Sequence, residues 1–172
     1  MRTIIVGCGR VGAGLAERLA RSGDEVTIID LRTDAFDRLE EGFGGQAVRG
    51  DGTDEDILRR AGADGADRFF ALTEGDNRNI LAAQLASETF AVPIVVAKIN
   101  DPVRADAYAA LGIATICRTS MMEDALGVFL GLPGDPRAGR VHTPTGHHPG
   151  PHPVAGAAER MGQALTVSNL ES

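Results

Sequence analysis

The sequence predicts a doubly wound α/β fold, in which helices cover both faces of one six-stranded parallel sheet. Apolar runs typical of buried strands alternate with amphipathic stretches typical of helices over residues 1–132. A glycine-rich turn, G-x-G-x-x-G, follows the first apolar run directly. Alternation at this pitch requires right-handed crossovers, and six strands then form two mononucleotide halves in the order 3-2-1-4-5-6. We therefore expect a Rossmann sheet.

The apolar runs place the six strands at residues 3–6, 25–29, 46–48, 68–72, 94–97 and 113–116. Helices are expected after the glycines up to Ser22-Gly23, and at residues 35–39, 53–62, 77–90, 103–111 and 120–130. Two capping boxes are predicted, one beginning at Thr53 and one at Ser120. The inner side of the helix at 77–90 is assigned to Ile80, Leu81, Leu85 and Phe90.

The last of these helices carries an apolar stripe after the sheet is complete. Met122, Leu126, Phe129 and Leu130 recur at helical spacing. Two interpretations stay open at this point: the stripe packs onto the chain's own sheet, or it crosses to a partner and is buried in a dimer.

Composition excludes several classes of protein. The net charge of −7 and the pI near 5.0 argue against nucleic acid as the main ligand, because phosphate binding needs a basic face. No apolar run is long enough to span a membrane, and the run at 4–6 is too short for a signal peptide. Cys8 and Cys117 fit neither a zinc knuckle nor a disulfide framework, so a reducing cytoplasm is expected.

The composition changes after Leu132. All 4 histidines and six of the 8 prolines lie beyond it, so residues 133–172 are expected to be a tail with a linker at 133–155 and a short helix at 157–165. The histidines also suggest a zinc or nickel site. However, they lack helical pairing, and a disordered linker is the better interpretation.

The glycine turn has the chemistry of a phosphate cradle. Gly7 permits the tight turn, Gly9 lets the backbone approach a pyrophosphate, and Gly12 lets the helix pack on the strand. The helix that follows presents free N–H groups, so Cys8, Arg10 and Val11 complete the predicted loop. A cation in a first helical turn opposes the helix dipole, which favours a phosphate contact for Arg10 over simple solvation.

Asp30 is predicted to hold a ribose. It ends the second strand and lies 18 residues after Gly12, close to the separation of roughly 20 that is typical of dinucleotide-binding units. Its charge would repel a 2′-phosphate, so NAD(H) or an adenine nucleotide such as ATP or ADP is favoured over NADP. Arg32, two residues later, is a cation that could reduce this preference against NADP.

Further candidates follow the other strands, at the edge where open α/β sheets bind ligands. Asp51 and Gly52 follow the third strand and could border an adenine, or form only a turn. Thr73 and Glu74 follow the fourth strand, where Thr73 could be only a helix cap. Lys98, the one lysine in the chain, ends the fifth strand and could meet phosphate or nicotinamide.

Four sequence features together resemble the TrkA-type potassium-uptake regulators, which carry the RCK (KTN) N-terminal domain. These features are the Gly-Arg-Val-Gly end of the glycine turn, Gly50-Asp51-Gly52-Thr53, Asp76-Asn77-x-Asn79 and Lys98-x-Asn100-Asp101-Pro102. The resemblance covers about residues 1–130.

The resemblance implies a cytoplasmic regulatory subunit of a membrane potassium transporter or channel. It also implies binding of NAD(H) or ATP/ADP and assembly as a dimer or larger ring, either from this chain alone or together with a second RCK protein. An acidic metal ligand is common in this family after the sixth strand, but Cys117-Arg118-Thr119 stands here, so no metal site is expected. The tail is also too short for the family's usual C-terminal lobe.

A small NAD-dependent oxidoreductase is the alternative. Hydride transfer to a carbonyl needs an acid or base placed beside the nicotinamide. Tyr108, the one tyrosine, is followed four residues later by Gly112, so a Tyr-x-x-x-Lys pair is absent, and every histidine lies in the tail. A binding module without catalytic residues is therefore preferred.

Overall fold

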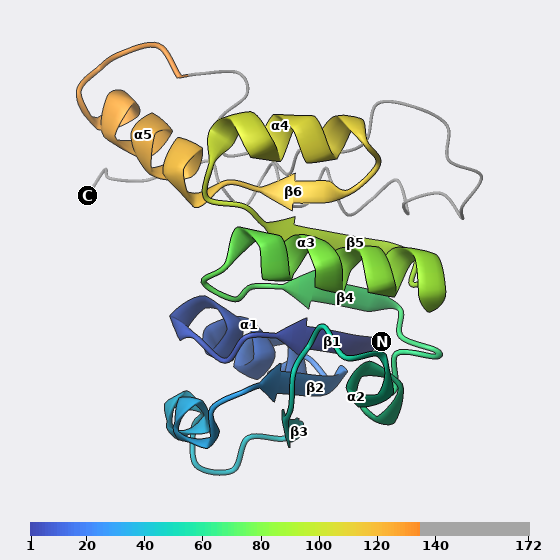
Figure 1. Ribbon diagram of the computed structural model, residues 1–172. Helices are drawn as coiled ribbons and strands as arrows, with labels where there is room; N and C mark the ends of the chain where they lie inside the picture. Colours follow the sequence, from blue (N-terminus) through green and yellow to red (C-terminus); the bar gives the residue numbers. More distant parts are fainter. Residues whose placement is uncertain (135–172) are drawn as a thin grey trace.

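The computed structural model describes residues 1–134 and shows one all-parallel sheet of six strands in the order β3-β2-β1-β4-β5-β6 (Figure 1). The predicted fold class and strand order are confirmed. The tail predicted for residues 133–172 falls, from residue 135 on, outside the described residues. So do the helix predicted at 157–165 and all four histidines.

The elements follow the chain in strict alternation. The strands are β1 (Arg2–Val6), β2 (Glu25–Asp30), β3 (Gln46–Arg49), β4 (Arg68–Ala71), β5 (Ile94–Lys98) and β6 (Ala114–Ile116). The α-helices are α1 (Arg10–Arg21), α2 (Glu55–Arg60), α3 (Asp76–Gln84), α4 (Pro102–Ala110) and α5 (Arg118–Phe129). A 3-10 helix, η1 (Thr33–Arg38), follows β2, and a π-helix, η2 (Leu85–Thr89), continues α3.

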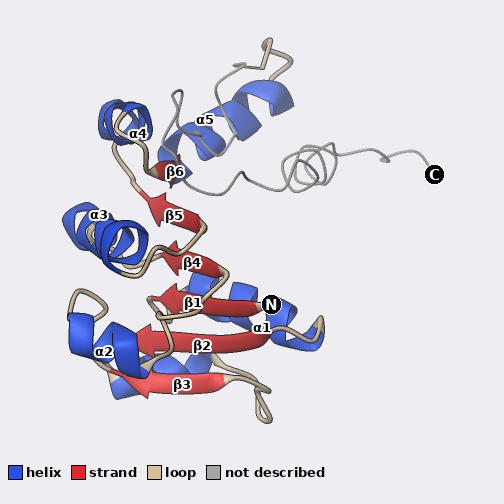
Figure 2. Ribbon diagram, turned by 90° about the vertical axis from the view of Figure 1, so that its right-hand side faces the viewer, coloured by secondary structure: helices blue, strands red, loops and turns tan. Residues whose placement is uncertain are grey.

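Helices cover the two faces of the sheet unequally (Figure 2). Helices α2, α3 and α4 lie along one face, where Phe69 and Ala71 of β4 are buried. Helix α1 and η1 cover the other face, where they pack against residues of β1 and β2 and against Phe70 of β4. Strands β1 and β2 are therefore apolar on both sides, as the continuous runs in the sequence predicted.

Helix α2 begins one residue later than predicted. The carboxylate of Asp54 accepts hydrogen bonds from the backbone N–H groups of Asp56 (2.8 Å) and Ile57 (3.3 Å), so Asp54 is the N-cap. The predicted cap at Thr53 is wrong because its hydroxyl donates instead to Asp51 Oδ1, at 2.7 Å. The predicted end is confirmed: Gly62 follows the helix with φ +91°.

Two other helices differ from their predicted form. The segment at 35–39 lies in the short 3-10 helix η1, and the long helix at 77–90 changes to the π-helix η2 at Leu85. Leu81 is 47% exposed, so its inward assignment is wrong, whereas Ile80 is buried. Asn79, Ile80 and Ala83 define the buried side of α3, and Leu81 falls on the opposite side of the helix.

Helix α5 begins at Arg118, directly after Cys117, and no side chain caps it. The capping box predicted at Ser120 is wrong because the helix has already begun two residues earlier. No residue of α5 is buried, and the helix projects away from the sheet (Figures 1 and 2). Its stripe is exposed: Met122 by 60%, Leu126 by 58%, Phe129 by 86% and the following Leu130 by 71%. Packing onto the chain's own sheet is therefore excluded.

Within residues 1–134, no helix has both the length and the apolar character that crossing a membrane requires.

Candidate functional site

The predicted site residues share one edge of the sheet, where all six parallel strands have their carboxyl ends (Figure 1). The glycine turn joins β1 to α1, and Asp30 is the last residue of β2. The remaining candidates are Asp51 and Gly52 after β3, Thr73 and Glu74 after β4, and Lys98 at the end of β5. Strand β1 lies between β2 and β4, so the glycine turn stands where the two halves of the sheet diverge. Ligands of open α/β sheets bind at this point.

The three glycines of the turn serve different purposes. A Cβ on Gly12 would lie 1.9 Å from the carbonyl oxygen of Gly7, so the absence of a side chain lets α1 approach β1. Gly7 has φ +106°, and a Cβ there would lie 2.9 Å from the backbone of Leu72 and Thr73. A Cβ on Gly9 would meet nothing within 4 Å. The space above Gly9 is open, as a loop that receives a pyrophosphate requires.

The N-terminus of α1 is prepared for an anion. Its N-cap is Gly9, no side chain caps it, and its first turn contains no acidic residue. Backbone N–H groups at a helix start need a partner, and a phosphate supplies one. Arg10 is exposed in this first turn and has no ion-pair partner among residues 1–134. Val11 beside it is 61% exposed.

Asp30 is hydrogen-bonded to the glycine turn itself. Its Oδ2 accepts the backbone N–H of Cys8 at 2.7 Å, and its Oδ1 accepts the N–H of Arg32 at 2.9 Å. The ribose candidate and the phosphate candidate are therefore held together by a direct contact. The Cys8 thiol points into the core and is fully buried. Burial, with a smaller effect from Asp30, raises the pKa of this thiol to about 11.

Arg32 is engaged away from Asp30. Its Nε donates to Asp34 Oδ1 at 3.0 Å, and its Nη2 donates to Asp34 Oδ2. This hydrogen bond from Arg32 is the main reason that the pKa of Asp34 lies below its usual value. The Arg32 guanidinium, which could have received a 2′-phosphate, therefore already has a carboxylate partner.

Asp51 forms a tight turn before α2. Its Oδ1 accepts both the N–H (2.9 Å) and the hydroxyl (2.7 Å) of Thr53. The backbone bond from Thr53 is the largest cause lowering the pKa of Asp51, and Arg78 contributes through its charge. Gly52 rests on the end of β1, where a Cβ would lie 2.1 Å from Val6 Cγ1. Asp51 is thus a turn residue at the ligand edge of the sheet.

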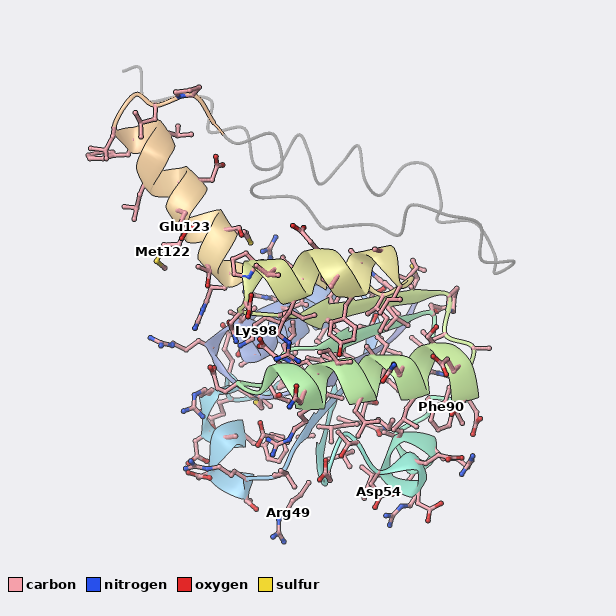
Figure 3. All side chains as sticks on the ribbon, turned by 45° about the horizontal axis from the view of Figure 1, so that its top comes forward. Arg49, Asp54, Phe90, Lys98, Met122 and Glu123 are labelled. Atoms are coloured by element: carbon pink, nitrogen blue, oxygen red, sulfur yellow. The ribbon has the colours of Figure 1, made fainter. Side chains whose placement is uncertain are left out.

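Lys98 is the buried cation of the site. Its side chain is 8% exposed, and its ammonium lies 3.6 Å from the carboxylate of Glu74, which is itself 85% exposed. Figure 3 shows Lys98 at the edge of the body near the start of α3. Within the described part of the chain this is the one ion pair of Lys98, and an ammonium group has three N–H donors. Lys98 therefore has donors left for an anion.

Thr73 does not cap α3, whose N-cap is Gly75. Its hydroxyl donates to Asn79 Oδ1 at 2.7 Å, and its backbone N–H donates to the same oxygen at 2.8 Å. Asn79 is fully buried, and the sequence had indicated no role for it. A polar residue on the inner side of a predicted helix was the signal that could have identified it.

Asp76 and Asn100 tie the start of α3 to the loop after β5. Asp76 Oδ1 accepts from the backbone N–H (3.0 Å) and the side-chain amide (2.9 Å) of Asn100. The carbonyl of Asn100 accepts in turn from the hydroxyl of Thr119, at 2.7 Å, at the base of α5. The two motifs 76–79 and 98–102 thus form one hydrogen-bonded network, which sequence reasoning had not connected.

No group of three or more His, Cys, Asp or Glu side chains is suitably placed for a metal ion within residues 1–134. A shallow hollow lined by Asp56, Arg59 and Arg60 lies on α2, away from the glycine turn. Arg59 of this hollow is paired with Glu55 at 2.7 Å and stacks over Phe90. These contacts indicate a solvated surface rather than a ligand site.

Several known proteins resemble this chain. It is 45% identical over 126 residues to the Trk system potassium uptake protein TrkA of Streptomyces coelicolor, covering 73% of this chain and 56% of that protein. It is 37% identical over 102 residues to the protein of the same name from Vibrio alginolyticus, covering 59% of this chain and 22% of that protein. The chain thus spans about half of the first relative and less than a quarter of the second.

Two solved structures share the fold. The Kef CTD of Shewanella denitrificans in its AMP-bound form has a TM-score of 0.65 and 23% identity, covering 76% of this chain and 79% of that one. The GsuK channel bound to NAD has a TM-score of 0.60 and 22% identity, covering 76% of this chain and 23% of that one. The model of the TrkA-N domain matches residues 3–119. The chain therefore belongs to the TrkA-N domain family, as the sequence motifs predicted.

Proposed function

We propose that residues 1–134 bind an adenine nucleotide across the carboxyl edge of the sheet. The observation that carries this proposal is the 2.7 Å hydrogen bond from the N–H of Cys8 to Asp30. It holds a carboxylate suited to a sugar diol directly against a glycine turn suited to phosphates. The open space above Gly9 and the uncapped start of α1 support the same assignment.

The roles within the site follow from these positions. Gly7, Gly9 and Gly12 shape the loop, the N–H groups at the start of α1 bind the phosphates, and Arg10 and Lys98 neutralise them. Asp30 accepts hydrogen bonds from the ribose hydroxyls. Asp51 and Gly52 border the adenine, and Thr73 and Glu74 line the side formed by β4.

The preferred ligand is NAD(H), with ATP or ADP as the alternatives. The charge of Asp30 opposes a 2′-phosphate, and Arg32 is paired with Asp34, so NADP is disfavoured. The GsuK channel bound to NAD and the AMP-bound Kef CTD share this fold, which supports a nucleotide with free ribose hydroxyls.

The whole protein is proposed to be a cytoplasmic regulatory subunit that controls potassium transport, held at the inner face of the membrane by a transporter or channel. Its similarity to potassium uptake proteins named TrkA supports this role. The nucleotide would act through a difference in its affinity for two arrangements of the assembly. No turnover is proposed, because Tyr108, the one tyrosine, stacks with Arg104 on α4 and has no lysine beside it.

The proposed assembly is a homodimer or larger ring, in which α5 packs against a second copy. On the face of the sheet that α1 covers only in part, Phe70, Val96, Ala114 and Ile116 form a row of partly buried apolar residues across β4, β5 and β6. The apolar stripe of α5 is exposed among the residues that the structure describes. Exchange of α5 between two copies would cover both surfaces.

Calorimetric titration tests nucleotide binding. NAD, NADH, ATP, ADP and NADP are titrated into the full chain and into Asp30→Ala, with Asp37→Ala, a carboxylate of η1 with no proposed role, as control. The expected result is binding of one of the first four ligands, weaker NADP binding, and a loss of affinity only in Asp30→Ala. If none of these ligands binds at millimolar concentration, the proposal is wrong.

Light scattering tests the assembly. The full chain is expected to give at least the mass of a dimer at micromolar concentration, and Leu126→Asp is expected to give a monomer with unchanged secondary structure. Glu123→Lys, a charge change on the same helix, is the control. A monomeric wild type would refute the exchange of α5.

A separate assay tests the proposed absence of catalysis: turnover of NADH with a carbonyl substrate would refute it.

A further inference from the structure

The side-chain amide of Asn79 occupies the point where β4 and β5 separate. The last paired residues of the two strands are Ala71 and Ala97. Beyond them the chain of β4 turns into the loop at Thr73, while β5 continues to Lys98. Backbone groups at such a divergence lose their ladder partners and need other ones.

Asn79 supplies these partners with its full hydrogen-bonding capacity. Its Oδ1 accepts from the N–H and the hydroxyl of Thr73, at 2.8 and 2.7 Å. Its Nδ2 donates to the carbonyls of Thr73, at 3.0 Å, and Lys98, at 2.8 Å. A side-chain amide offers two acceptor sites and two N–H groups, so nothing remains free. The residue is fully buried, which makes every one of these bonds costly to lose.

The residues that Asn79 holds are two of the candidates for the nucleotide site. Lys98 carries a nearly buried ammonium whose one ion pair among residues 1–134 is a 3.6 Å contact with exposed Glu74. That weak contact does not fix the direction of a long side chain. The backbone of Lys98 is held on one side by its pairing with Ile116 of β6 and on the other by Asn79, and the same amide holds Thr73 across the gap.

We propose that Asn79 is a positioning residue of the nucleotide site, which sets Lys98 and Thr73 at the distance needed to receive the ligand's phosphates. This inference rests on the proposed nucleotide binding. Asn79 acts through Lys98 and Thr73 and does not itself touch the ligand. The bridge from Asn79 to Lys98 joins residues 19 apart in the sequence, and together with the bonds to Thr73 it couples the ends of β4 and β5 at the ligand edge.

The single lysine gives a direct readout. Full-length protein labelled with ¹³C at the lysine ε-carbon, with a lysine-free tag, shows one signal from Lys98. Pyrophosphate and NAD are the probes, and both are expected to shift this signal in the wild type. Asn79→Asp removes both N–H donors, and Asn79→Ser shortens the bridge without adding charge. Asn77→Asp is the matched control, because it makes the same change on an exposed residue of α3 that contacts Arg104 instead.

Both Asn79 variants are expected to move the Lys98 signal in the free protein and to weaken NAD binding at least about tenfold, which corresponds to about 1.4 kcal/mol. Asn77→Asp is expected to behave as wild type in both measurements. A purely structural role for Asn79 would lower the melting temperature but leave the signal and the affinity of the remaining folded protein unchanged.

The outcomes separate the two proposals. If neither probe moves the Lys98 signal of the wild type, nucleotide binding itself is wrong. If the wild type responds and folded Asn79 variants respond equally, nucleotide binding stands and the positioning role is wrong. If the Asn79 variants do not fold, a measurement on the wild-type protein still tests the positioning role. The Nδ2 protons of Asn79 must resist exchange with solvent and shift when pyrophosphate is added, and unaffected protons would refute the role.

Discussion

Two glycines of one motif are predicted to respond in opposite ways to the same substitution. Gly12→Ala would place a methyl group 1.9 Å from the carbonyl oxygen of Gly7, whereas Gly9→Ala would place one in open space. Gly9 has φ −80° and ψ −176°, which alanine adopts without strain. The first change should therefore damage the fold and the second only the ligand site.

The structure sets the size of each effect. For Gly12→Ala the contact must lengthen by at least about 1.1 Å to reach the 3.0 Å below which Cβ contacts do not occur. Both sides of the contact are backbone, so α1 must move away from β1. Overpacking of this kind costs about 1–3 kcal/mol, and we expect the upper end. Gly9→Ala exchanges glycine for alanine at the N-cap of α1, where alanine is the poorer residue, and this costs about 0.5–1 kcal/mol.

Urea unfolding followed by circular dichroism measures the first effect, and calorimetric titration with NAD measures the second. Gly9→Ala should lose less than about 1 kcal/mol of stability but bind NAD at least about tenfold more weakly, because its methyl group occupies the space assigned to the pyrophosphate. Gly14→Ala, a change on the same helix that also meets open space, is the control for both assays. The reasoning fails if Gly9→Ala loses more than about 1 kcal/mol of stability, or if it binds NAD as the wild type does.

Three further changes test other parts of the structure. Asp24 accepts from the terminal ammonium of Met1 (2.9 Å) and from Arg68 (2.7 Å), and the bond from the ammonium is the main cause of its lowered pKa. The stability it adds is present above about pH 4 and is lost as the pH falls through its folded pKa. Asp24→Asn should therefore lower the free energy of unfolding by about 1–2 kcal/mol at pH 7 and flatten its acid decline in urea titrations. Asp54→Ala removes the cap of α2 and should cost about 1 kcal/mol in the same assay, whereas equal stability would contradict the cap. Cys8 is fully buried with a pKa of about 11, so a thiol reagent at pH 8 should label it only in denaturant, and rapid labelling of the native protein would show that the loop opens.

The sheet could be predicted from the sequence because its causes are local. Continuous apolar runs mark strands that are covered on both faces, and the handedness of crossovers then fixes the strand order. The glycine turn and Asp30 could be predicted for the same reason, since their spacing is set by one strand, one helix and one further strand. The contact between Cys8 and Asp30 shows that the two predictions concern a single site.

The errors at helix ends have a different origin. Thr53 and Asp54 are both good caps, and adjacent candidates differ by too little for a pattern to separate them. What decides is Asp51, which accepts the Thr53 hydroxyl and leaves Asp54 to cap α2. The choice therefore depends on a turn three residues back, whose geometry the capping pattern does not encode.

The role of Asn79 depends on partners that no local pattern identifies. An asparagine on the inner side of an amphipathic helix is unfavourable unless its amide has hydrogen-bond partners. Here the partners are Thr73 and the carbonyl of Lys98. These partners lie in the loop after β4 and at the end of β5, and the one on β5 becomes a neighbour only after the crossover has folded. The same holds for Asp76, whose carboxylate accepts a hydrogen bond from Asn100, a residue that lies 24 positions later in the sequence. Strand order can be inferred from the handedness of the crossovers. The hydrogen bonds between strand ends can be identified only when the distances between the side chains are known. Asn79 and Asp76 form such bonds at the edge of the sheet where a ligand would bind.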